Sequence, residues 1–203
     1  MKYYIKQGVF PFIYIIFMSI TALGITVIED LVWLKIILAI VNIGLYALIV
    51  VAVSFKEGQE SIKVQHANDL ERRQIIMTGE NRPLKIHEEY KPWKGFVFGF
   101  VACVPLLFLL LLHTVIYLVT GTYIGVGAIA AIIYFMFFIF FSFGHISGDG
   151  TTTFSWYSYF GTLIALPVIM VLTGIAYNLG AKKIQNQRKI IEEKQREIYG
   201  DKV

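Results

Sequence analysis

The sequence predicts an all-α membrane protein: a polytopic bundle of about five transmembrane helices with a polar helical loop and an amphipathic C-terminal helix. Of its 203 residues, 57% are hydrophobic and only 16% are charged. Residues 95–181 contain a single formally charged side chain, Asp149. Soluble surfaces are where charges collect, so this stretch cannot form the surface of a soluble domain. Eight of the 18 Lys and Arg lie in residues 56–94 and seven in residues 182–202, so the charges are segregated.

This segregation divides the chain into four parts. Residues 1–55 form an N-terminal transmembrane hairpin, and residues 56–94 form a polar, partly helical loop that faces water. Residues 95–181 contain three apolar segments, and residues 182–203 are a charged amphipathic tail. The net charge of +4 belongs to the two water-facing parts, so nucleic-acid binding is not needed to explain it.

The first two apolar runs are long enough to cross a bilayer, which takes about 20 residues. The first covers residues 9–28, with Pro11 in its opening turn, where a missing N–H costs little. It is too long for a secretory signal and lacks a clear cleavage site. The second covers residues 34–55 and begins beside Trp33, an interfacial anchor.

The polar loop is expected to contain a helix over residues 59–77. Asp69 precedes Arg72 and Arg73 by three and four residues, the spacing at which side chains meet on a helix. Gly79 follows directly and can adopt the left-handed conformation that ends many helices. The loop is nearly balanced in charge, with eight basic and seven acidic residues.

The remaining spans are expected at residues 96–119, 123–143 and 156–179. Pro105 and Pro167 lie inside the first and last of these and predict kinks. Gly95 and Gly99, four residues apart, would allow close helix packing.

The tail is expected to be a thin amphipathic helix over residues 184–199. Ile184, Ile191 and Ile198 recur at seven-residue spacing, which is too little for a coiled coil. The helix would lie on the membrane or against a partner.

Charge distribution conflicts with five spans. Loops that carry many Lys and Arg residues favour the cytoplasmic face, and both the loop and the tail carry many of them. Three spans between them would place them on opposite faces. Four spans plus a re-entrant segment, with one of the runs 96–119 or 123–143 dipping and returning, would place both on one face.

Four residues form a candidate polar site. His145 and Asp149 lie among glycines and threonines and could bind a cation or relay a proton, although turn composition alone explains them. His113 lies inside a span and shares a helical face with Tyr117. An ionisable residue at that depth suggests function, and a neutral histidine bonded to a neighbouring helix is the alternative.

Other polar residues have simpler interpretations. Asn42 and Asn178 are expected to tie helices together. The loop also carries several residues capable of binding a metal: His66, Asp69, His87, Glu88 and Glu89. Their spacing fits no zinc motif, and a solvated charged surface is the better interpretation, so no metal and no cofactor are predicted. The sequence contains no P-loop, GxGxxG or GxSxG motif.

Two functions follow. The first is a non-enzymatic, multi-pass protein of the cell membrane, either a small transporter component or an accessory subunit of a membrane complex. It would contact the lipid bilayer and would bind anionic lipid or a protein partner through residues 56–94 and 182–203. The alternative is an intramembrane enzyme or proton-coupled carrier using His113, His145 and Asp149.

Overall fold

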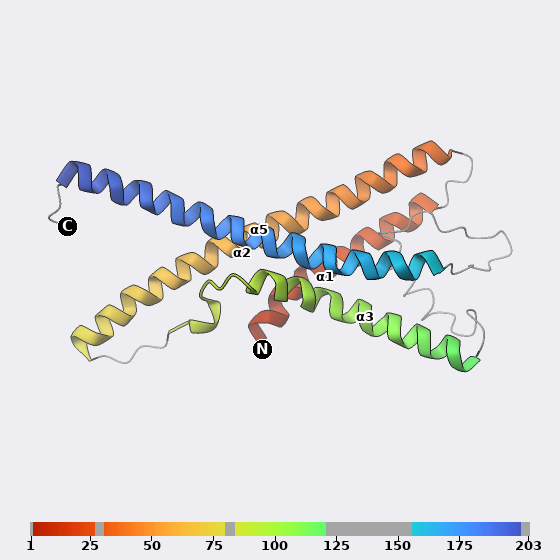
Figure 1. The fold of residues 1–203 in the computed structure, drawn as a ribbon, viewed down its shortest axis with the longest axis horizontal. Helices are drawn as coiled ribbons and strands as arrows, with labels where there is room; N and C mark the ends of the chain where they lie inside the picture. Colours follow the sequence, from red (N-terminus) through yellow and green to blue (C-terminus); the bar gives the residue numbers. More distant parts are fainter. Residues whose placement is uncertain (1, 27–30, 80–83, 121–155, 200–203) are drawn as a thin grey trace.

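The computed structural model describes residues 2–26, 31–79, 84–120 and 156–199. These residues form four α-helices and one short 3₁₀ helix: α1 (Lys2–Thr26), α2 (Val32–Thr78), η1 (Ile86–Glu88), α3 (Lys94–Thr120) and α5 (Trp156–Tyr199). Helices α2 and α5 run in the same general direction and cross as an X (Figure 1). Helices α1 and α3 begin near this crossing and run the opposite way. The most extensive helix contacts are those between α2 and α5, followed by those between α3 and α5.

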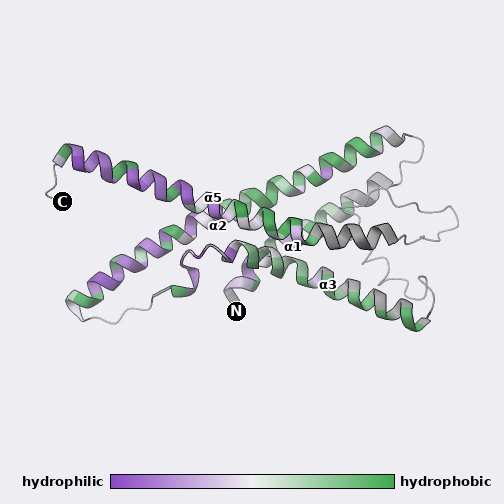
Figure 2. Ribbon diagram, in the orientation of Figure 1, coloured by the Kyte–Doolittle hydropathy of each residue, from purple (hydrophilic) through white to green (hydrophobic). Residues whose placement is uncertain are grey.

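Apolar and polar residues separate along the length of the molecule (Figure 2). Helix α1, helix α3 and the parts of α2 and α5 before the crossing make an apolar half. Beyond the crossing, α2 and α5 continue as polar helices, which we term the α2 arm (residues 56–78) and the α5 arm (residues 182–199). Both arms extend from the same end of the molecule and diverge (Figure 1).

The expectation of a five-span polytopic bundle is wrong for the residues that the structure describes. Only one stretch there, Ile36–Thr78 of α2, is a helix long and apolar enough to cross a membrane. Within α1 and α3, the apolar stretches Tyr3–Met18 and Lys94–Pro105 are shorter than the length a bilayer requires. The alternative of four spans plus a re-entrant segment fails for the same reason. The expected span at residues 123–143 lies outside the described residues.

The apolar runs of the sequence do not coincide with whole helices. The runs at 34–55 and 156–179 are the first parts of helices that continue through the polar boundary into the arms. The predicted loop helix 59–77 and tail helix 184–199 are therefore not separate elements. A multi-pass arrangement is not supported, and α2 is the one candidate membrane helix among the described residues.

The candidate membrane stretch of α2 is not the core helix of a soluble protein, which would be largely buried. Only 18% of its most apolar window is buried. Large apolar side chains on its surface are exposed, namely Ile36, Ile37, Ile40, Val41, Leu45 and Leu48. Exposed apolar surface on this scale marks a contact with lipid or with another protein.

The end of α2 follows the prediction from its sequence. Gly79 has φ 69°, and its N–H donates to the carbonyl of Ile75 at 2.9 Å. It is the one residue with positive φ in the described part of the chain. The left-handed glycine cap expected after Thr78 is confirmed, and it stops a helix that contains no other break.

Glycines allow α2 and α5 to touch at the crossing. A Cβ atom added at Gly58 would overlap the carbonyl oxygen of Tyr177, and one added at Gly180 would overlap that of Phe55. The contact is reciprocal, because each helix presents a glycine to the other helix's backbone. The predicted close packing of Gly95 and Gly99 is also observed: added Cβ atoms would lie 3.0 Å and 2.8 Å from α5 Cα atoms.

A small core lies on the apolar side of the crossing and includes side chains from all four α-helices: Ile15, Met18, Tyr46, Val50, Cys103, Leu166 and Ile169. Asn42 joins α2 to α1 there. Its amide donates to the Met18 carbonyl at 3.1 Å, and its Oδ1 lies 2.7 Å from the Thr21 hydroxyl. In an apolar setting such a polar contact holds two helices in one register.

We predict that Gly58→Ala and Gly180→Ala each lower the free energy of unfolding by about 1–3 kcal/mol, because the added methyl group forces the two backbones apart. Gly44→Ala is the matched control in α2, since nothing lies within 4 Å of its added Cβ. It should raise stability by up to about 1 kcal/mol through helix propensity. Thermal unfolding in a mild detergent would measure all three, and equal effects at Gly44 and Gly58 would contradict a close crossing.

Candidate functional site at the helix crossing

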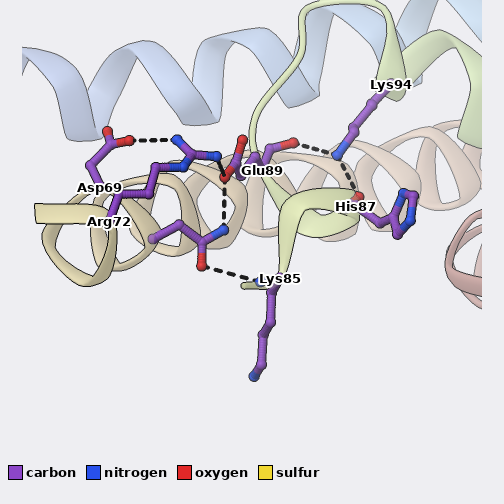
Figure 3. Close-up of polar contacts among 7 residues, drawn as sticks. Asp69, Arg72, Lys85, His87, Glu89 and Lys94 are labelled. Carbon is purple, nitrogen blue, oxygen red and sulfur yellow. Dashed lines mark hydrogen bonds and ion pairs between the residues drawn. The ribbon is translucent and has the colours of Figure 1, made fainter. Parts of the chain in front are cut away.

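Lys94, the first residue of α3, is at the centre of a polar cluster beside the crossing. The residue is completely buried. Its ammonium group donates to the backbone carbonyls of His87, at 2.6 Å, and Glu89 (Figure 3). A buried charge needs such partners, because burial removes its hydration. The contacts fold residues 84–93 back onto the start of α3.

Two tyrosines from the N-terminus complete the surroundings of this lysine. Its Nζ lies 5.3 Å from the ring centroid of Tyr3 and 6.0 Å from that of Tyr4. Aromatic faces attract a cation at these distances. Burial and, to a smaller extent, the charge of Lys91 nevertheless lower the pKa of Lys94 to about 8, although Glu89 and Glu88 act in the opposite direction. The ammonium is held mainly by dipoles and rings rather than by a carboxylate.

Glu89 fastens the same segment to the α2 arm. Its Oε1 accepts from the Asn68 amide at 2.8 Å and from Arg72 at 2.5 Å (Figure 3). Arg72 also pairs with Asp69 at 2.8 Å, which confirms the ion pair predicted from their spacing. Asn68 in turn accepts the backbone N–H of Lys85 at 3.3 Å. One arginine thus joins two carboxylates from separate elements.

The segment is fastened to α5 as well. The ring of Tyr90 stacks on that of Tyr177, with centroids 5.6 Å apart. The Tyr90 hydroxyl donates to Asn178 Oδ1 at 2.6 Å, and the Asn178 amide donates to the carbonyls of Pro92, at 3.0 Å, and Gly174, at 2.8 Å. Residues 84–93 therefore hold the two crossing helices together.

A few buried polar atoms in the described part of the chain lack well-formed hydrogen bonds. Ser61 Oγ, the Tyr177 hydroxyl and Gln7 Oε1 make no hydrogen bond of normal geometry. Ser61 is close enough to Tyr3 to lower its pKa somewhat, but burial dominates and raises that pKa to about 12. Burial also raises the pKa of Glu57, although the nearby Gln7 side chain opposes this shift.

The polar site predicted from sequence stays a prediction. His113 and Tyr117 belong to α3, but the positions of their side chains lie outside the description. His145 and Asp149 lie outside the described residues altogether. The structure therefore does not test whether these four residues meet.

The possible metal ligands of the polar loop are arranged differently from a metal site. Among the described residues, no three His, Cys, Asp or Glu side chains come together to hold a metal ion. Asp69 and Glu89 do lie near each other, but the Arg72 guanidinium occupies the space between them. Their arrangement fastens the loop to the α2 arm.

Sequence analysis missed Lys94 as the central residue. A lysine beside Trp93 and before an apolar run is typical of an anchor at the lipid headgroups. The position of Tyr3 and Tyr4 over its ammonium depends on how α1 meets α3, which no local pattern reveals. Trp93 itself remains half exposed and stacks on Tyr4 at 5.9 Å.

The polar contacts around Lys94 join structural elements to one another. The Lys94 ammonium, the Glu89 carboxylate and the Arg72 guanidinium all have partners within the chain. No family model, curated protein or solved structure matches the chain.

The low pKa of Lys94 predicts how stability depends on pH. The folded protein releases the Lys94 proton near pH 8, whereas an unfolded chain retains it until about pH 10.5. Because the unfolded state binds more protons in this window, the free energy of unfolding should rise as pH increases from 8. Burial raises the pKa of the Cys103 thiol from 9.0 to about 12, which has the opposite effect from about pH 9, and the raised pKa of Tyr3 does the same above pH 10, so the useful range is pH 8–9.

Thermal unfolding followed by tryptophan fluorescence would measure this pH dependence in detergent. Lys94→Met should abolish the rise between pH 8 and 9, whereas Lys91→Met, at an exposed position, should keep it. A wild-type melting temperature that falls or stays constant over this range would contradict a charged, desolvated Lys94.

Proposed function

We propose that this protein is a membrane-anchored accessory subunit that presents two polar helical arms to partners in the aqueous phase. Helix α2 is the anchor, and the exposed apolar surfaces of the neighbouring helices lie against lipid or against apolar parts of a membrane complex. The cluster around Lys94 fixes the arms relative to the apolar half. No step of bond-making chemistry is assigned to the protein.

One observation carries this proposal: both arms leave the apolar half at the same end (Figures 1 and 2). A molecule divided in this way has one end suited to lipid and one suited to water. The arms are long, and their outer surfaces are exposed, including Leu70, Ile76 and Met77 near the tip of the α2 arm. Such surfaces are suited to recognition by another protein.

The polar cluster favours a structural role over a catalytic one. Its charged groups are bonded to carbonyls and to each other, so a substrate would have to displace these contacts. Asn42, Asn178 and Tyr90 likewise join elements to one another. This use of polar groups supports a rigid adaptor.

Cysteine labelling tests the arrangement directly. Cys103 is the single cysteine in the chain and is buried, so Cys103→Ser provides the background. Single cysteines would replace three exposed residues: Leu31 before α2, Gln74 on the α2 arm and Gln187 on the α5 arm. An impermeant maleimide should modify Gln74→Cys and Gln187→Cys from the same side of sealed membranes and Leu31→Cys from the other.

Each variant carries a single thiol in the same Cys103→Ser background, so a difference in labelling reflects the position of that thiol. Labelling of the two arm positions from opposite sides would refute the proposed arrangement. Release of the protein from membranes by alkaline carbonate would refute α2 as a spanning anchor.

A further inference from the structure

The α5 arm is a helix that no other described element covers. Ala181 is fully buried, but every residue from 185 to 199 is exposed. At about 1.5 Å per residue, the arm extends on the order of 20 Å beyond the crossing. Isolated helices of this length are marginal in water, and protein helices normally gain stability from packing one face. The arm therefore lacks the contact that a helix of this kind usually makes.

The charge of the arm distinguishes it from the α2 arm. Residues 182–199 contain six basic residues and three acidic ones, whereas residues 56–78 contain four of each. The basic residues Arg188 and Lys189 lie in the exposed stretch. Complementary potentials select partners and suppress wrong ones, so the α5 arm favours an acidic surface.

Its apolar stripe restricts the shape of that surface. Ile191 and Ile198 are 54% and 72% exposed and continue the line of the half-buried Ile184. The positions three residues after Ile184 and Ile191 are Gln187 and Lys194, so the stripe lacks a second apolar residue there; Ile190 and Tyr199, 52% and 66% exposed, lie to its sides. A coiled-coil seam requires apolar residues at both of these positions. A second α5 arm would also bring together two helices with the same positive balance.

The direction of the α5 arm argues against a lipid bilayer as the surface that it binds. The arm continues the axis of α5 away from the apolar half (Figures 1 and 2). If the apolar half enters the membrane, the arm projects outward from it. The remaining candidate for the binding partner of the α5 arm is a protein in the aqueous phase.

We propose that the α5 arm docks into an acidic groove of a partner protein, with Ile191 and Ile198 entering apolar pockets and the flanking basic residues contacting carboxylates. This mode resembles other amphipathic helices that bind in grooves through spaced anchors. The inference rests on the proposed accessory role and specifies the chemistry of its partner.

The test uses the full-length protein in detergent micelles and two labelled synthetic helical peptides. Both are helical hairpins whose groove is lined with leucines; glutamates line the edges of the groove in one and lysines in the other. The acidic peptide should bind and the basic one should not, and added salt should weaken binding because screening acts on exposed charges. Fluorescence anisotropy measures the affinities.

Variants locate the binding to the arm. The double variant Arg188→Glu, Lys194→Glu, at positions three residues before and after Ile191, should weaken binding of the acidic peptide by about tenfold or more, since like charges repel. Ile191→Ser should weaken it without changing its salt dependence. Arg73→Glu, an exposed charge reversal on the α2 arm, is the matched control and should have little effect.

Other outcomes would overturn the inference. Failure of the acidic peptide to bind, or equal binding of both peptides, contradicts an acidic partner. Binding of the arm to phosphatidylglycerol vesicles in place of the acidic peptide indicates a lipid surface, and cross-linking between Gln187→Cys copies in place of peptide binding indicates a second copy. Because these assays use micelles, they are independent of the labelling that tests the membrane arrangement.

Discussion

The close crossing of α2 and α5 is the constraint on which the rest of the structure depends. Gly58 and Gly180 each remove a side chain where the other helix passes, so the backbones meet directly. Helices can approach this closely only where small residues face each other. The crossing determines where the apolar half ends and where the two arms separate. Lys183 also lies 5.7 Å from the Phe55 ring centroid, on the polar side of the contact.

The cluster around Lys94 makes sense as a consequence of that crossing. Two crossing helices without further support can rotate about their contact. Residues 84–93 oppose this rotation, because Glu89 bonds to the α2 arm while Tyr90 and Pro92 bond to Asn178 of α5. Lys94 then ties the same segment to α3 and to the tyrosines of α1. A buried lysine is costly, and here it joins three parts of the chain: residues 84–93, α3 and α1.

The prediction of five spans is wrong for a physical reason. Hydropathy reports which residues avoid water, but it does not report where a helix ends. At Phe55 and Lys56 the composition changes abruptly, yet Val32–Thr78 is one continuous helix. A helix ends where a cap or breaker stops it, as Gly79 does, and a change from apolar to charged residues is not a breaker. Because α2 and α5 cross this boundary together, both arms lie at one end, which the five-span arrangement did not allow.

The sequence alone determined the features that depend on local chemistry. Helical structure, the Gly79 stop, the Asp69–Arg72 pair and the close packing of Gly95 and Gly99 all follow from residue types at short spacing. Only the tertiary structure decided the features that join distant segments. The pairing of Gly58 with Tyr177 and the burial of Lys94 among His87, Glu89, Tyr3 and Tyr4 depend on the angles at which helices meet. Those angles arise from packing over the whole molecule, and no window of sequence contains them.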